Sequence, residues 1–206
     1  MNMSDSPRTR LALLGTMSDL HNQPISYDLR NLQKIVTDLA PDLLCAEVTK
    51  EAWEGGDLTH ASLELRKALA PTVTMTDIVL VPVVPSTRQF ADFAPLGGWR
   101  QRLIRTFDRL LRWGQSRANS AESINGAWFG LFCHSVCELT EMFWSKQDRA
   151  AWESQNQTLV ENIVRTIWNN QGSRVLVAVQ CQRLHRLIPL LEKHSNLFDL
   201  VGYQNL

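Results

Sequence analysis

The chain has 206 residues, a length that is typical of one domain rather than two. Hydrophobic residues make up 44% of it and charged residues 20%, both ordinary fractions for a globular protein. The 21 basic and 21 acidic residues cancel, which removes the usual electrostatic argument for a nucleic-acid or anionic-membrane partner. We therefore expect residues 1–206 to form a single α/β domain, with residues 1–10 as a polar N-terminal tail.

The cysteine positions and the hydropathy pattern predict a cytoplasmic protein without a membrane partner. Cys45 and Cys181 lie inside apolar runs, where buried reduced thiols are the usual state. The start of the chain has no signal-type apolar stretch. The longest apolar-looking stretch, 124–144, is interrupted by His134, Glu138 and Glu141, which argues against a membrane-spanning helix.

The first elements read as a strand–helix–strand unit. Residues 11–16 form a short apolar run that predicts a buried strand. Apolar residues at helical spacing predict a helix over 26–40, with Asn22 and Pro24 at its start and Pro41 at its end. Residues 43–48 then predict a second buried strand, which contains Glu47. This order predicts parallel pairing of the two strands through a right-handed crossover.

The remainder of the chain continues to alternate between helices and strands. We expect 51–57 and 85–98 to be loops, and 114–120 to break the helical pattern. Helices are predicted at 59–69, 99–113, 121–145, 149–169 and 183–194. Strands are predicted at 78–84, 174–179 and 198–203, and Pro82 favours an edge position, a bulge or an early end for the first of these. The fold class is α/β: a mostly parallel sheet of about five strands, flanked by helices in three layers.

A candidate site follows from the ends of the predicted strands. In an open parallel sheet, ligands bind beyond the carboxyl ends of the strands. Gly15 and Thr16 end the first strand, and Glu47 lies at the end of the second. A carboxylate at that place is costly unless it is paired, solvated or coordinated. Glu47 is therefore a candidate metal ligand or general base, and the alternative is a glutamate that caps a helix or pairs with an arginine.

Common catalytic motifs are absent from the sequence. It contains no Walker-type loop, no GxGxxG, no GxSxG and no HExxH, so nucleotide binding and serine-hydrolase chemistry have no direct support. The arginines of 99–117 are typical of a solvated helix face.

The order of these segments resembles a superfamily that includes the TraB-like proteins, the erythromycin esterases, the ChaN-like proteins and the Tiki-type metalloproteases. Its pattern is a strand ending in Gly-Thr-x-His, then Pro-Asp with an apolar strand and a glutamate, later a polar helix starting with Arg-Asn or Arg-Asp, and finally a strand ending in Gly-x-x-His. The retained positions are Gly15, Thr16, Glu47 and Asn156. The resemblance spans most of the chain.

Four positions depart from that pattern. Ser18 and Arg183 stand where the two histidines are expected, Gln180 replaces the glycine, and Gln155 replaces the arginine. In the proteases and esterases of the superfamily, the histidines and the glutamate are thought to hold a metal or to move protons. Arginine cannot reproduce this role, because its permanent charge repels a divalent cation.

Three hypotheses follow. In the first, the chain is a divergent member of the superfamily that kept a pocket around Ser18, Asn156 and Arg183, while its hydrolytic chemistry was lost or changed. Arg183 would then pair with Glu47 or hold an anionic ligand. In the second, a metal-assisted hydrolase cleaves an ester or peptide bond with Glu47 and either His21 or His185, and its cofactor is a divalent metal. In the third, exposed tryptophans make a non-catalytic interaction module. The expected ligand is a small molecule or a peptide, and a homo-oligomer is left open.

Overall fold

The structure is a computed structural model, and it describes residues 8–85, 98–118 and 120–206. Within these residues, five parallel strands form one sheet in the order β3-β2-β4-β1-β5. Their bounds are β1 (Thr9–Thr16), β2 (Leu43–Thr49), β3 (Val79–Val84), β4 (Arg174–Gln180) and β5 (Phe198–Val201). The predicted α/β class with a three-layer arrangement is confirmed.

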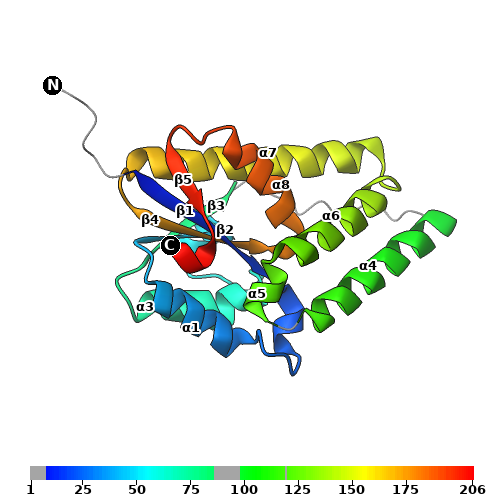
Figure 1. Ribbon diagram of the computed structural model, residues 1–206, viewed down its shortest axis with the longest axis horizontal. Coiled ribbons are helices and arrows are strands. Elements are labelled where there is room, and N and C mark those ends of the chain that lie inside the picture. Colours follow the sequence, from blue (N-terminus) through cyan, green and yellow to red (C-terminus); the bar gives the residue numbers. More distant parts are fainter. Residues whose placement is uncertain (1–7, 86–97, 119) are drawn as a thin grey trace.

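Helices cover both faces of the sheet, as Figure 1 shows. One face carries α1 (Leu29–Leu39) and a helix that runs through the π-helical turn η2 (Leu65–Leu69) into α3 (Ala70–Thr74). The other face carries α7 (Lys146–Asn169) and α8 (Cys181–Glu192). The helices α4 (Trp99–Arg117), α5 (Ala121–Ile124) and α6 (Ala127–Glu141) gather near the carboxyl ends of the strands. Short helices complete the chain: η1 (Ser18–Asn22), α2 (Lys50–Glu54) and η3 (Tyr203–Asn205).

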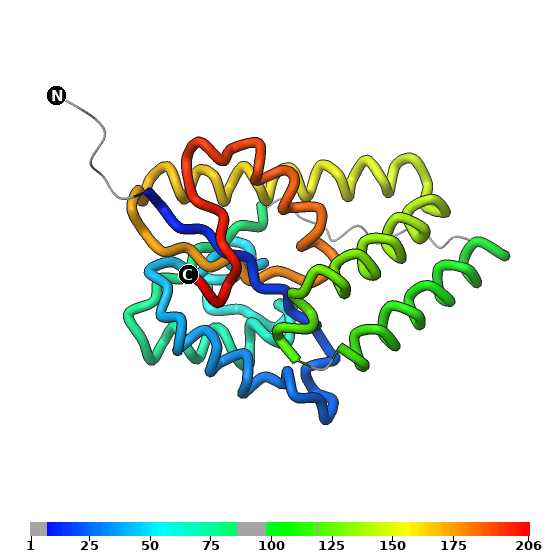
Figure 2. The backbone as a smooth tube through the Cα atoms, in the orientation of Figure 1, coloured from blue at the N-terminus to red at the C-terminus, as the bar shows by residue number. Residues whose placement is uncertain are grey.

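The central strands read as continuous apolar runs because both of their faces are covered. In β1, Leu11 and Leu13 join the core on the α7 and α8 side, whereas Ala12 and Leu14 join the core on the α1 side. Successive side chains of a strand point to opposite faces of the sheet, so one strand supplies both cores. Figure 2 shows that the last strand of the chain runs beside the first, and β5 pairs with β1 in parallel.

The position of β4 corrects the predicted pairing of the first two strands. β1 and β2 are parallel, but β4 lies between them and pairs with both, through Val177 beside Leu13 and Cys45. β1 and β2 lead to helices on one face of the sheet, whereas β4 leads to α8 on the other. At the carboxyl end of β4 the chain therefore turns to one face of the sheet, whereas at the ends of β1 and β2 it turns to the opposite face. Such switch points are where parallel sheets form binding crevices.

Three local predictions are corrected by capping and turn chemistry. The first helix begins at Leu29, because Asp28 accepts a hydrogen bond from the backbone of Asn31 (2.8 Å), and not near Asn22 or Pro24. Residues 50–54 are helical rather than a loop, since Thr49 caps them. The next helix continues through Pro71 instead of ending before it. A π-helical turn precedes this proline, and the side chain of Gln33 bonds the Lys67 carbonyl, which has lost its usual amide donor.

Other element boundaries also differ from the predictions. β1 starts at Thr9, inside the predicted tail, and α4 continues through Gly114 to Arg117. The predicted helix at 121–145 divides at Gly126 into α5 and α6. Of the three alternatives that Pro82 left open, the edge position is confirmed, since β3 is the outermost strand of the described sheet on its side. Most of the predicted loop at 85–98 lies outside the described residues. In the described part of the chain, no helix is long and apolar enough to cross a membrane.

Candidate functional site

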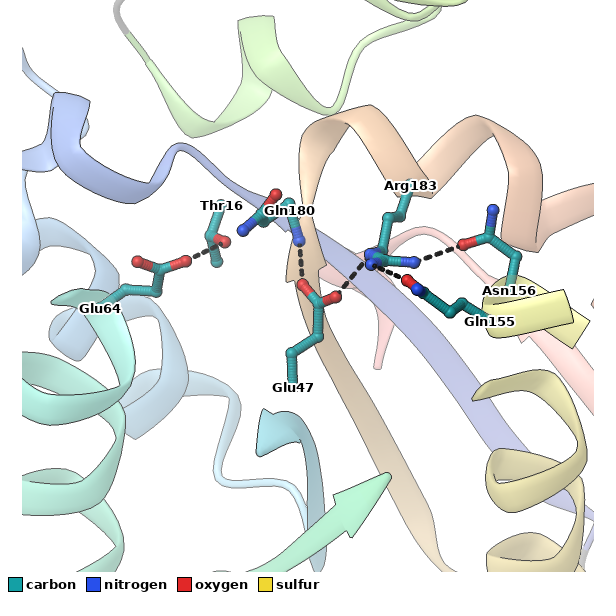
Figure 3. Close-up of polar contacts among 7 residues, drawn as sticks. All are labelled: Thr16, Glu47, Glu64, Gln155, Asn156, Gln180 and Arg183. Atoms are coloured by element: carbon teal, nitrogen blue, oxygen red, sulfur yellow. Dashed lines mark hydrogen bonds and ion pairs between the residues drawn. The ribbon is translucent and has the colours of Figure 1, made fainter. Parts of the chain in front are cut away.

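Polar side chains from three neighbouring strands meet at the carboxyl edge of the sheet (Figure 3). Glu47 lies near the end of β2, where the pairing with β3 shifts register between Ala46 and Thr49. The side chain of Glu47 is 12% exposed. The backbone N–H of Gln180 donates a hydrogen bond to its Oε2 (2.8 Å), and Nε of Arg183 lies 2.7 Å from its Oε1. Both oxygens of this carboxylate are therefore engaged by the end of β4 and the start of α8.

Arg183 occupies a buried position in the first turn of α8, with a side chain that is 5% exposed. Its Nη1 donates to Oδ1 of Asn156 (2.7 Å), and its Nη2 donates to Oε1 of Gln155 (3.3 Å). Its Nε has no aligned hydrogen-bond acceptor among the described residues, so the contact with Glu47 is an attraction between charges. Burial lowers the pKa of Arg183, and the charge of Glu47 acts in the opposite direction. The guanidinium is thus in contact with Glu47, Asn156 and Gln155.

Helix α7 supplies most of the surroundings of Arg183. Trp152 and Asn156 are four residues apart and share one face of this helix. The Trp152 ring lies under the guanidinium, with 4.1 Å between the Cζ atom of Arg183 and the ring centroid. The planar cation is bonded along its edge and stacked on its face, which is a geometry that lysine or histidine would not reproduce.

His21 is built into the loop after β1 and not into this cluster. Its Nε2 accepts a hydrogen bond from the backbone N–H of Met17 (3.0 Å), and its Nδ1 bonds the carbonyl of Tyr27 (2.8 Å). An amide can only donate and a carbonyl can only accept, so the two contacts require a neutral ring with its proton on Nδ1. Burial lowers the pKa of His21, in agreement with the neutral form. Neither ring nitrogen is available to Glu47 or to a metal.

His185 lies on a different side of α8 from Arg183, because two residues correspond to about 200° around a helix. Its ring packs on α6 at Gly130, where a Cβ atom would come within 2.7 Å of its Cε1. Burial and the nearby His134 both lower the pKa of His185. Of the residues predicted for catalysis, the structure brings Glu47 to Arg183 and Asn156, and it brings neither histidine to Glu47.

The predicted pocket residues at the end of β1 have separate roles. The N–H of Gly15 donates to Oδ1 of Asn125 (2.7 Å), and a Cβ at Gly15 would lie 3.3 Å from the Cβ of Cys181, which favours glycine here. The hydroxyl of Thr16 donates to Oε1 of Glu64 (2.8 Å), as Figure 3 shows. Ser18 adopts a left-handed backbone conformation, with a φ of 52°.

Glu64 is a site residue that the sequence reasoning missed. It is 3% exposed, and its second carboxylate oxygen has no hydrogen-bond partner among the described residues. Burial is the largest cause that raises the pKa of Glu64, while the hydrogen bond from Thr16 lowers it. A signal was present in the sequence: Glu64 precedes the buried Ala68 by one helical turn, so it belongs to the apolar face of its helix.

Two hollows lie on either side of the end of β4. A cleft of about 550 Å³ opens beside Glu47, and its polar walls come from Glu51, Asp57, His60 and Gln180. A smaller cavity of about 160 Å³ lies on the other side, where it is lined by Thr16, Ser18 and Cys181. Both hollows lie at the switch points between β4 and its neighbours. The predicted pocket residues Asn156 and Arg183 line neither of them.

Tryptophans are also exposed on α4 and α6. Trp128 on α6 is 87% exposed and Trp113 on α4 is 55% exposed, and both line a groove between these helices. Across the ranges 8–85, 98–118 and 120–206, no group of three or more histidine, cysteine, aspartate or glutamate side chains is placed to hold a metal ion.

Comparisons with known proteins found no relative of this chain. No protein-family model, no curated protein and no solved structure matches the chain.

Proposed function

We propose that this chain is a ligand-binding protein, a divergent member of the TraB and erythromycin esterase superfamily whose hydrolytic chemistry has been lost. The observation that carries the proposal is the engagement of both Glu47 oxygens, one by the Arg183 guanidinium and the other by the Gln180 amide. The permanent positive charge beside this carboxylate opposes both the uptake of a proton and the binding of a divalent cation. The geometry supports Glu47 as a structural anchor of the strand ends.

The surroundings of Arg183 support the same conclusion. In the superfamily pattern a histidine is expected at this position, and Asn156, Gln155 and Trp152 here fit a planar cation instead. Because the charge of arginine is permanent, a divalent cation beside Glu47 would be repelled. The polar groups that would surround a metal in a hydrolase instead fix the start of α8 to β2 and α7.

The cleft beside Glu47 supports binding of a small molecule. Its volume of about 550 Å³ lies within the usual range for ligand pockets, roughly 300–1,000 Å³. Its polar lining is dominated by acceptors, with the carboxylates of Glu51 and Asp57 near the imidazole of His60. A ligand with amine or hydroxyl groups matches this lining, because such groups donate hydrogen bonds to carboxylates.

The experiment compares binding and hydrolysis on the full chain. Thermal shift with a library of small amines and polyols should give ligands whose shift is lost in Asp57→Asn and kept in the control Asp77→Asn, on the opposite edge of the sheet. A panel of esters and peptides with added zinc or manganese should give equal background rates for the wild type and Glu47→Gln. Metal-dependent hydrolysis that disappears in Glu47→Gln would instead support the hydrolase alternative and would refute this proposal.

Protein binding through α4 and α6 is a second candidate, favoured by the exposure of Trp113 and Trp128 on one groove. Large aromatic side chains are enriched in the energetic centres of protein interfaces. A change in oligomeric state between the wild type and Trp128→Ser, measured by light scattering after size exclusion, would support this candidate. An unchanged monomer in both proteins would exclude self-association through this groove.

A further inference from the structure

Two cysteines from different helices meet beside the small cavity. Cys181 is the first residue of α8 and directly follows β4, and Cys133 lies on α6. The thiol of Cys133 donates a hydrogen bond to the carbonyl oxygen of Cys181 (3.8 Å), and each of the two thiols shifts the pKa of the other. Both residues are buried, and all four cysteines of the chain are free thiols. They are 48 residues apart in sequence, so only the packing of α6 on α8 brings them together.

The sulfur of Cys181 accepts a hydrogen bond from a neighbouring helix. The side-chain amide of Gln115 donates to it from α4 over 3.0 Å, and the backbone N–H of Gln182 also contributes. The neighbouring Cys133 thiol is the largest cause that lowers the pKa of Cys181, against the effect of burial. Donors aimed at a sulfur favour its thiolate form, which is the reactive one.

Cys45 provides the contrast within the same chain. It is fully buried in the apolar core of β2, and burial raises the pKa of its thiol to about 12. No donor to its sulfur is seen in the described part of the chain. Cys45 has the surroundings of an inert core cysteine, whereas the sulfur of Cys181, although also buried, accepts a hydrogen bond from Gln115.

A small cavity adjoins Cys181. The cavity of about 160 Å³ is lined by Cys181 and Gln115, and the exposed residues Asp19, Asp108 and Arg112 contribute to its walls. It exceeds the space that one water molecule needs, roughly 10–15 Å³ on the same measure. A reactant of a few atoms therefore fits in the cavity that Cys181 lines, and a bulky aromatic disulfide reagent does not.

We propose that Cys181 and Cys133 form a peroxide-reactive dithiol, in which Cys181 is the attacking thiol and Cys133 resolves it. The sulfur of Cys181 attacks one oxygen of hydrogen peroxide, the O–O bond breaks, and the leaving hydroxide takes the thiol proton to form water. The sulfur of Cys133 then attacks the sulfenic acid, the S–O bond breaks, and a second water leaves with the Cys133 proton. The two thiols are oxidised to one disulfide while the peroxide is reduced to two waters.

Peptide mapping after limited exposure of the full chain to hydrogen peroxide tests this reaction. We expect a cross-linked peptide that joins Cys133 to Cys181, with Cys45 remaining reduced. The cross-link should be absent in Cys133→Ser, where a dimedone adduct on Cys181 should accumulate instead. It should persist in the matched control Cys137→Ser, which removes the neighbouring thiol one helical turn along α6.

Two further measurements keep the proposal open to refutation if a cysteine variant folds poorly. Gln115→Met, which removes the donor while keeping the side-chain length, should slow the reaction with peroxide about tenfold, the effect of one unit in the pKa of the thiol. Native wild type should react with peroxide faster than with an aromatic disulfide. A Cys133–Cys137 cross-link, equal oxidation of Cys45 and Cys181, or an unchanged rate in Gln115→Met would each overturn it.

Discussion

The guanidinium of Arg183 lies 2.7 Å from the carboxylate of Glu47 and ties the start of α8 to the end of β2. Both side chains are largely buried, at 5% and 12% exposure. The positive charge is further held by Asn156 and Gln155, and the negative charge by the amide of Gln180. The pair therefore differs from the exposed ion pairs of this chain, such as Lys34 with Asp38, which are worth little.

Removal of Arg183 should show that the buried ion pair contributes more to stability than an exposed one. Arg183→Met leaves the Glu47 carboxylate without its cation in a mostly buried place, so we expect the free energy of unfolding to fall by about 3–5 kcal/mol. Urea denaturation at neutral pH measures the loss. The double variant Glu47→Gln/Arg183→Met removes both charges and should regain part of it. A loss below about 1 kcal/mol, the size typical of a surface pair, would contradict the buried pairing.

Replacement of Glu64 by glutamine should change how stability depends on pH. Burial raises the pKa of Glu64 in the folded state, so its contribution is fully present below the unfolded pKa and is lost as pH rises through the folded value. Glu64→Gln keeps an acceptor for the Thr16 hydroxyl but cannot ionise. We expect this variant to be more stable than the wild type at neutral pH, with the difference shrinking in acid.

Urea denaturation from acid to neutral pH measures the effect of Glu64→Gln. The control is Glu54→Gln, an exposed glutamate at the end of α2. The control curve should follow that of the wild type. Parallel curves for Glu64→Gln and the wild type would show that the buried carboxyl does not control this pH dependence.

His21 should behave as a structural residue. Burial lowers its pKa, so its stabilising contribution is present above the unfolded pKa near 6.5 and is lost as pH falls through the folded value. His21→Ala removes hydrogen bonds to Met17 and Tyr27, and should cost about 1–3 kcal/mol at neutral pH. The variant should lose less stability than the wild type between neutral and mildly acid pH. Exposed His60, changed to alanine, provides the control, and equal acid sensitivity of His21→Ala and the wild type would rule out this role.

The contact between α6 and α8 should depend on the absence of a side chain at residue 130. A Cβ there would lie 2.7 Å from Cε1 of His185, so Gly130→Ala forces the ring to move. Overpacking of this kind costs typically about 1–3 kcal/mol. The control is Gly202→Ala, whose Cβ would make an ordinary contact at 3.6 Å with Asn205. Chemical denaturation compares the two, and an equal effect of both changes would argue against close packing at His185.

Local patterns in the sequence determined the class of the fold. Apolar runs predicted all five strands, and the helical stripe that includes Leu159 and Ile163 predicted α7, because strand and helix periods are properties of neighbouring residues. The rule for strand ends placed Thr16 and Glu47 at one edge of the sheet, and the structure agrees. Pairing of Glu47 with an arginine was among the alternatives that the sequence left open.

The tertiary structure alone decided the strand order and the partners at the site. β4 enters between β1 and β2 from far along the chain, and its apolar composition resembles that of its neighbours, so no local pattern selects its position. The same insertion brings Gln180 and Arg183 to Glu47. Side-chain partners of this kind depend on contacts across more than a hundred residues, whereas sequence periodicity reports only on the nearest turns of the chain.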